Sequence, residues 1–107
     1  SVDAIICFGV LVRGETQHFE YISSAVSTGL MQVQLSSNLP VLYGVLNCLT
    51  LEQAQDRCGP KSPLPLSLAT TALRMASLNV ETKKVLPDLT VPRAAMSLPM
   101  VPPCSQG

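Results

Sequence analysis

The stretch AIICFGVLVRGETQHFEYISSAVSTGL, from Ala4 to Leu30, decides the fold because its hydrophobic period changes part-way along. Its first nine residues, Ala4–Val12, form an unbroken apolar run rich in Ile and Val, typical of a strand covered on both faces in a parallel sheet. From His18 onward apolar residues recur every three or four positions, which predicts an amphipathic helix whose apolar face contains Phe19, Ile22, Val26, Leu30 and Val33. A strand is therefore followed directly by a helix.

The residues that follow complete a repeating pattern. We expect the helix to end near Asn38, because Pro40 cannot continue it. Val41–Leu46 (VLYGVL) then predicts a second buried strand, and strand, helix and strand in this order form a βαβ unit with parallel pairing. Thr50 and Gln53 have the spacing of a capping box, which predicts a short helix ending at about Arg57.

Beyond this unit the pattern weakens. A break rich in proline runs from Gly59 to Pro65, and Ser67–Thr82 then predicts a last helix. Residues 85–107 contain five of the nine prolines and show no period. We therefore expect a domain over residues 1–84 and a proline-rich, disordered tail over residues 85–107.

The composition of the chain excludes several classes of protein. A chain of 107 residues is one domain or part of one, and 47% apolar with 13% charged residues is typical of a folded protein. Seven acidic and seven basic residues give no basic face for nucleic acid, and no apolar run reaches the roughly 20 residues of a membrane span. The four cysteines form no CxxC and no zinc spacing, so we expect free thiols and no bound metal.

The loop after the first strand is the best candidate site. In an open parallel sheet, ligands bind beyond the carboxyl ends of the strands, where free amides of a helix start attract phosphate. Gly14 would let an anion approach the backbone, Thr16 adds a hydroxyl, and His18 is the type of side chain that exchanges protons near neutral pH. From spacing alone, His18 is better explained as a surface or capping residue, and Arg57 is better explained as a partner of the helix dipole.

Four blocks of this chain resemble the lumazine synthase family. They are GVLVRGETQHFEY (Gly9–Tyr21), VSTGLMQVQL, PVLYGVL (Pro40–Leu46) and TLEQAQDR (Thr50–Arg57). The blocks have the same spacing as in the family, with no insertions between them. The resemblance implies an α/β fold of the flavodoxin-like type, a three-layer sandwich with a parallel sheet. It also implies that this chain lacks the N-terminal strand and helix of the family.

The resemblance implies roles for the residues that contact phosphate. His18 matches the proposed acid/base of the family. Glu15 and Thr16 match the loop that holds the phosphate of 3,4-dihydroxy-2-butanone 4-phosphate through backbone amides and the hydroxyl. Arg57 matches an arginine that pairs with the same phosphate.

The resemblance also implies a site for the second substrate, 5-amino-6-(ribitylamino)uracil. The strand end that lines it matches Val10, Leu11 and Val12. Tyr43 matches an aromatic position, usually Phe, that faces the pyrimidine. In the family the equivalents of Tyr43 and Arg57 come from a neighbouring subunit, so the resemblance implies a homopentamer or a shell of pentamers.

The implied activity is a transferase reaction of riboflavin biosynthesis, the condensation of the two substrates to 6,7-dimethyl-8-ribityllumazine, with no cofactor. We expect a cytoplasmic protein, or a plastid one where a transit peptide precedes Ser1. Two alternatives stay open at this point. One is a non-catalytic fragment or decayed paralogue that acts at most as a structural subunit of a pentamer. The other is an unrelated nucleotide-binding module, although the sequence contains no GxGxxG and no P-loop.

Overall fold

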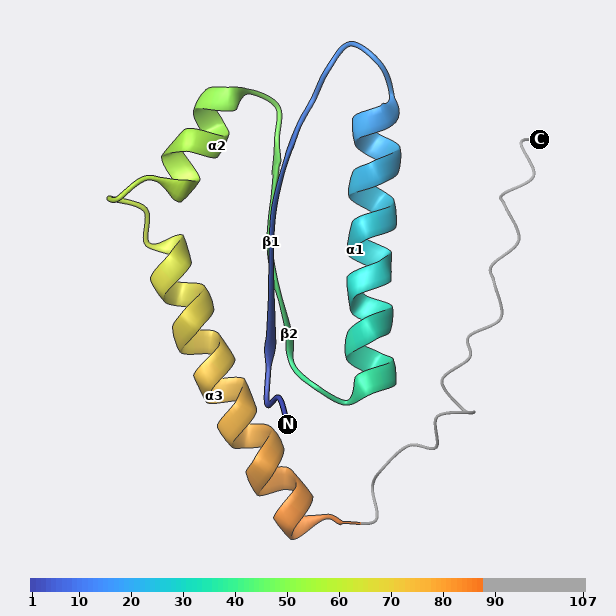
Figure 1. The fold of residues 1–107 in the computed structure, drawn as a ribbon, viewed down its shortest axis with the longest axis vertical. Coiled ribbons are helices and arrows are strands. Elements are labelled where there is room, and N and C mark those ends of the chain that lie inside the picture. The colour runs from blue at the N-terminus through green and yellow to red at the C-terminus, as the bar shows by residue number, and fades with distance from the viewer. Residues whose placement is uncertain (88–107) are drawn as a thin grey trace, which may run out of the picture.

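The computed structural model describes residues 1–87, which form two strands and three helices (Figure 1). In chain order these elements are β1 (Ile5–Val12), α1 (His18–Ser37), β2 (Val41–Cys48), α2 (Leu51–Cys58) and α3 (Leu64–Val85). The predicted tail lies outside the described residues apart from Val85, which ends α3, and the two residues after it. The division at residue 84 stays a prediction.

The strands pair in parallel, as the sequence predicts. Their register runs from Ile5 opposite Val41 to Val12 opposite Cys48, so both carboxyl ends meet at one edge of the sheet. Helix α1 packs on one face of the sheet, and α2 and α3 pack on the other (Figure 1). This is the predicted three-layer α/β arrangement, with two strands in the described part of the chain.

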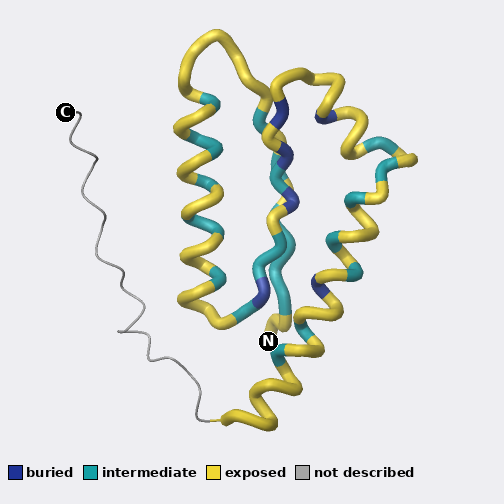
Figure 2. The backbone as a smooth tube through the Cα atoms, turned by 180° about the vertical axis from the view of Figure 1, so that it is seen from behind, coloured by how far each residue is buried: buried dark blue, intermediate teal, exposed yellow. Residues whose placement is uncertain are grey.

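The core lies between β2 and the layer of α2 and α3. Leu46, Cys48 and Ala54 are the buried members of one cluster, and Leu64 of α3 packs against it. Cys48 is only 2% exposed. Burial is therefore greatest along β2 itself, while the helices are buried only on the sides that face the sheet (Figure 2).

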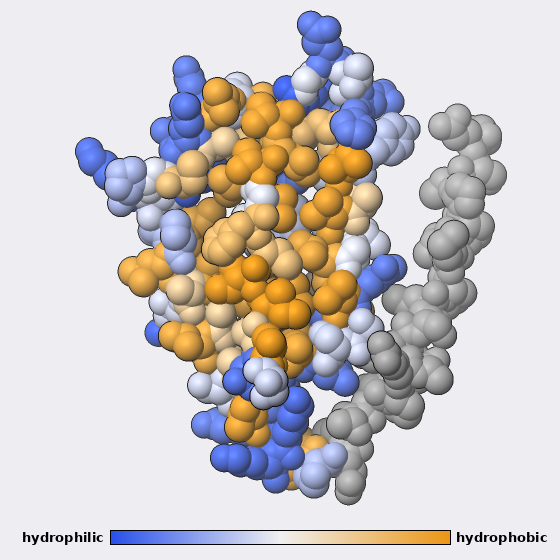
Figure 3. All heavy atoms as spheres, in the orientation of Figure 1, coloured by the Kyte–Doolittle hydropathy of each residue, from blue (hydrophilic) through white to orange (hydrophobic). Residues whose placement is uncertain are grey.

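The prediction that the first strand is covered on both faces is wrong for one face of β1. Phe8 is 72% exposed and Val10 is 53% exposed. The reason is that β1 is an edge strand within residues 1–87, and the helices contact β2 more extensively than β1. Figure 3 shows apolar side chains gathered over the middle of one side of the molecule, between α1 and α3.

Gly44 brings the sheet and α3 close together. A Cβ atom at this position would lie 2.7 Å from the carbonyl oxygen of Cys7 and 3.1 Å from Cδ1 of Leu68. The first of these contacts is shorter than real Cβ atoms make and is to backbone, and the second is tight, so any larger residue here would force the sheet to shift. A different feature ends α1, where Asn38 adopts a left-handed conformation with φ 55° and its amide donates to the carbonyl of Gln34.

The last two helices begin differently from one another. In α2 the Thr50 hydroxyl accepts from the amide of Gln53 at 3.3 Å, and the Gln53 side chain accepts from the amide of Leu49 at 2.9 Å, as the capping box predicts. Helix α3 starts at Leu64, three residues before the predicted Ser67. The prediction placed Pro65 in a break, but proline is well tolerated in the first turn, where its missing N–H has no helical partner.

Candidate active site

The loop from Arg13 to Gln17 leaves the carboxyl end of β1 and leads into α1. The Arg13 amide donates to the carbonyl of Cys48 at 2.9 Å, which extends the pairing of the strands by one residue. The Arg13 side chain then forms an ion pair with Glu20 in the first turn of α1, with Nε and Oε1 3.0 Å apart. This pair neutralises an acidic side chain that would otherwise repel an anion at the start of the helix.

The first turn of α1 has unused hydrogen-bond donors. Gln17 occupies the N-cap position without a side-chain hydrogen bond, and Thr16 Oγ1 accepts only a long 3.4 Å bond from the His18 amide. Among the described residues, no hydrogen bond engages the amides of Phe19 and Glu20. Free amides at a helix start attract anions, so this turn offers the geometry that phosphate binding needs.

Three predicted site residues lie together at this turn. Glu15, Thr16 and His18 are all exposed, and they follow one another across the loop and the first helical residue. A Cβ atom at Gly14 would meet nothing within 4 Å, so no contact within residues 1–87 requires glycine there. The space beside the Gly14 backbone is open to a ligand.

The end of β1 contributes side chains to both faces of the sheet. Residues alternate along a strand, so Val10 and Val12 point to one face and Leu11 to the other. Val10 lines an apolar hollow of about 200 Å³ that also contains Arg57 of α2 and Leu68 of α3. The even-numbered face is therefore the one beneath α2 and α3.

Tyr43 and Arg57 form a second group of predicted residues. They border one hollow of about 280 Å³ along the open edge of β2 from opposite faces of the sheet, since Tyr43 contacts Ser27 of α1 whereas Arg57 belongs to α2. Arg57 also borders a larger hollow of about 550 Å³ that contains Lys61. Two cationic side chains at one opening suit a phosphate, because both donate charged hydrogen bonds.

Asn47 and Lys61 were not among the predicted site residues. The predicted strand ended at Leu46, whereas β2 runs to Cys48 and places Asn47 four positions after Tyr43 on the same face. Continuing the period of two beyond Leu46 is the signal in the sequence that could have indicated Asn47. Lys61 lies in the proline-rich segment between α2 and α3, where no periodic pattern indicates which side chains meet.

The two groups do not meet within one chain. His18 begins α1 on one side of the sheet, while Arg57 lies near the end of α2 on the other side (Figure 1). Arg57 lines three hollows, and His18 lines none of them. A single chain therefore presents two separate half-sites: the α1 half-site of Glu15, Thr16 and His18, and the β2 half-site of Tyr43 and Arg57.

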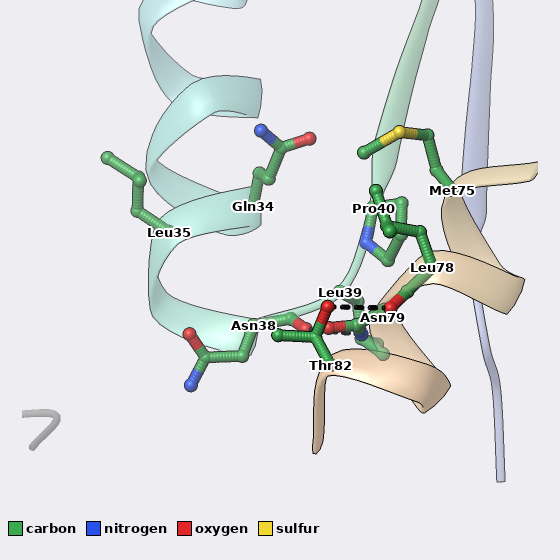
Figure 4. Close-up of a pocket in the computed structure, with 9 residues that line it drawn as sticks. All are labelled: Gln34, Leu35, Asn38, Leu39, Pro40, Met75, Leu78, Asn79 and Thr82. Atoms are coloured by element: carbon green, nitrogen blue, oxygen red, sulfur yellow. Dashed lines mark hydrogen bonds between the residues drawn. The ribbon is translucent and has the colours of Figure 1, made fainter. Parts of the chain in front are cut away.

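Another hollow lies at the opposite end of the sheet and contains none of the predicted residues. It measures about 280 Å³ and lies between the end of α1 and α3, lined by Leu35, Pro40 and Met75 among others (Figure 4). The side-chain Nδ2 of Asn79 in α3 donates to the backbone carbonyl of Asn38 at 3.0 Å and ties the two helices together beside the hollow. Its place at the amino ends of the strands sets it apart from the two half-sites.

Comparison with known proteins identifies the family of this chain. Residues 1–80 match the family model for 6,7-dimethyl-8-ribityllumazine synthase. The chain belongs to the lumazine synthase family. The resemblance inferred from the four sequence blocks is thereby confirmed, and with it the flavodoxin-like α/β fold.

Individual lumazine synthases match over different lengths. The enzyme named 6,7-dimethyl-8-ribityllumazine synthase of Synechococcus elongatus is 42% identical over 96 residues, covering 87% of this chain and 53% of the relative. That of Pyricularia oryzae is 58% identical over 57 residues, covering 53% of this chain and 28% of the relative. That of Trichormus variabilis is 40% identical over 86 residues, covering 80% and 45% respectively. The chain thus spans about half the length, or less, of these relatives.

Two further observations concern the described residues alone. None of the helices in residues 1–87 is both long and apolar enough to cross a bilayer. The same residues contain no group of three His, Cys, Asp or Glu side chains that could hold a metal ion. Cys7, Cys48 and Cys58 are free thiols, and only Cys48 is buried.

Proposed function

We propose that this protein acts in riboflavin biosynthesis as a lumazine synthase. It condenses 5-amino-6-(ribitylamino)uracil with 3,4-dihydroxy-2-butanone 4-phosphate to 6,7-dimethyl-8-ribityllumazine and releases phosphate and water. The observation that carries this proposal is the start of α1, where unengaged amides lie in the same turn as Thr16 and His18. Family membership supports the assignment of this turn to phosphate.

Each half-site has its own part in the proposed reaction. At the α1 half-site, the Glu15–Thr16 loop binds the phosphate, and His18 transfers protons as the amine attacks the ketone and the imine forms. Imine formation releases one water, phosphate is then eliminated, and the ring closes with loss of a second water. The end of β1, which consists of Val10, Leu11 and Val12, lines the binding site of the pyrimidine substrate beside this turn. Orientation of two bound substrates supplies much of the rate acceleration, so no cofactor is required.

The β2 half-site completes the active site of a neighbouring subunit. Tyr43 faces the pyrimidine, and the Arg57 guanidinium pairs with the phosphate in a bidentate manner. Because one chain holds His18 and Arg57 on opposite sides of its sheet, the complete site needs two chains. We propose a homo-oligomer with the cyclic arrangement of a pentamer, active in the cytoplasm.

Turnover by the purified chain tests the proposal. Both substrates are supplied, and lumazine formation is followed by absorbance against the uncatalysed condensation. The His18→Ala variant is expected to lower kcat by about 100-fold, the usual contribution of a positioned acid/base. Arg57→Ala is expected to raise KM for the phosphate substrate by about tenfold, because it removes a charged hydrogen-bond donor.

A matched control separates these effects from general damage. Arg74 lies on the exposed surface of α3 and lines none of the hollows described above, so Arg74→Ala is expected to leave both parameters unchanged. A chain that forms lumazine no faster than the uncatalysed reaction would overturn the proposed activity. It would favour the structural-subunit alternative instead.

A further inference from the structure

A small hydrogen-bond network joins α1 to β2 on one face of the sheet. The Tyr43 hydroxyl donates to Oδ1 of Asn47 at 2.6 Å, and Nδ2 of Asn47 donates to the Ser23 hydroxyl at 3.0 Å. The Ser27 hydroxyl lies 3.2 Å from the Tyr43 hydroxyl and 2.7 Å from the carbonyl of Ser23. Two helix residues and two strand residues are thus connected through Asn47 and Ser27.

The chemistry of the groups shows which bond holds Tyr43. A serine hydroxyl has one hydrogen, and for Ser27 the shorter contact is the one to the Ser23 carbonyl. The Tyr43 hydroxyl therefore depends mainly on its short bond to Asn47. Asn47 in turn has a fixed orientation, because its nitrogen donates to Ser23 while its oxygen accepts from Tyr43.

This anchor acts on a ring that borders a hollow. Tyr43 is 37% exposed, so part of the residue is open to a ligand, and it borders the hollow that also contains Arg57. The hydroxyl lies on the long axis of the ring, and holding it fixes the direction of that axis. An aromatic face held in one direction can stack on a flat heteroaromatic ring without first losing side-chain freedom.

We propose that Asn47 is a positioning residue that orients Tyr43 for the pyrimidine substrate. This inference rests on the proposed function and adds a residue to it. Asn47 acts through Tyr43, so its loss affects recognition of the pyrimidine and leaves recognition of the phosphate substrate unchanged.

The experiment compares KM for each substrate in four proteins. These are the wild-type chain, Asn47→Leu, Tyr43→Phe and the double variant. Each single variant removes the anchoring hydrogen bond, and the expected result is a rise of about fivefold in KM for the pyrimidine with no change for the phosphate substrate. The double variant is expected to show the same rise and no more, because both substitutions remove one interaction.

Two further variants separate positioning from a merely structural role. Asn47→Asp keeps an oxygen that accepts from Tyr43, so it is expected to restore KM to near the wild-type value. Asn79→Leu removes a comparable asparagine tether between α3 and the end of α1, far from both half-sites, and is expected to change neither KM.

The outcomes are distinguishable. If the wild-type chain turns over and Asn47→Leu changes neither KM, or changes both equally, the positioning role is overturned while the proposed function stands. An effect of the double variant equal to the product of the two single effects would also overturn it. If the wild-type chain neither binds the pyrimidine nor forms lumazine, the proposed function fails and this inference fails with it.

Discussion

Replacing Gly44 by alanine tests the packing of the sheet against α3. The added Cβ atom would lie 2.7 Å from the Cys7 carbonyl oxygen, whereas ordinary van der Waals contact begins at 3.4 Å. Removing this overlap requires the two strand backbones to separate by about 0.7 Å, which stretches their hydrogen bonds beyond useful length. The added Cβ atom would also lie 3.1 Å from Cδ1 of Leu68 and 3.1 Å from Cδ1 of Phe8, so these side chains restrict its movement in other directions.

The expected cost follows from these contacts. Overpacking at a buried site costs about 1–3 kcal/mol, and weakening a hydrogen bond of the ladder costs about 1 kcal/mol more. We therefore expect Gly44→Ala to lower the free energy of unfolding by about 3 kcal/mol. For a domain of this size that corresponds to a fall of about 15 °C in Tm.

The assay uses a matched substitution in the same chain. Gly29 lies within α1, and a Cβ atom there meets nothing within 4 Å, so Gly29→Ala is expected to raise stability by about 0.5–1 kcal/mol through helix propensity. Thermal melts followed by circular dichroism at equal protein concentration compare the two variants. Equal Tm values for Gly44→Ala and the wild type would refute the close packing of β2 between β1 and α3.

Three other substitutions test separate parts of the account. Gly14→Ala is expected to preserve Tm, because its Cβ meets no atom within 4 Å, but to raise KM for the phosphate substrate; an unchanged KM would argue against phosphate beside this backbone. Thr50→Ala is expected to lower stability by about 1 kcal/mol in urea denaturation, since it removes the cap of α2, and Thr28→Ala on the exposed side of α1 serves as its control. Phe8→Ser is expected to reduce self-association of the chain in sizing chromatography, because Phe8 is 72% exposed on an edge strand; unchanged elution would show that this surface is not what associates.

Local pattern predicted most elements of the fold. The change of period after Val12 located both β1 and α1, and the capping box located α2. The apolar face of α1 was wrong at one position, since Val33 is 44% exposed while Gln34 is half-buried. Gln34 accepts from the amide of Val41 at 2.9 Å, a polar contact that hydrophobic periodicity does not reveal.

Features that depend on distant neighbours were harder to predict. The exposure of Phe8 depends on how many strands lie beside β1, and that number is not encoded in the strand itself. Asn47 was overlooked because the predicted strand stopped at Leu46 and because its partner Ser23 on α1 is distant in the sequence. Arg57 could be named in advance, but its separation from His18 required the positions of α1 and α2 on opposite faces of the sheet.

Mixing two variants that each lack one residue of the shared site tests the central claim most directly. His18→Ala and Arg57→Ala chains are unfolded together, refolded as mixed oligomers and assayed for lumazine formation at a concentration of the phosphate substrate well below its KM, where both variants alone turn over slowly. If each site combines His18 from one chain with Arg57 from its neighbour, about one quarter of the sites are intact in a random equal mixture, so about one quarter of wild-type activity returns. Activity no higher than that of the two variants assayed separately would contradict the shared site.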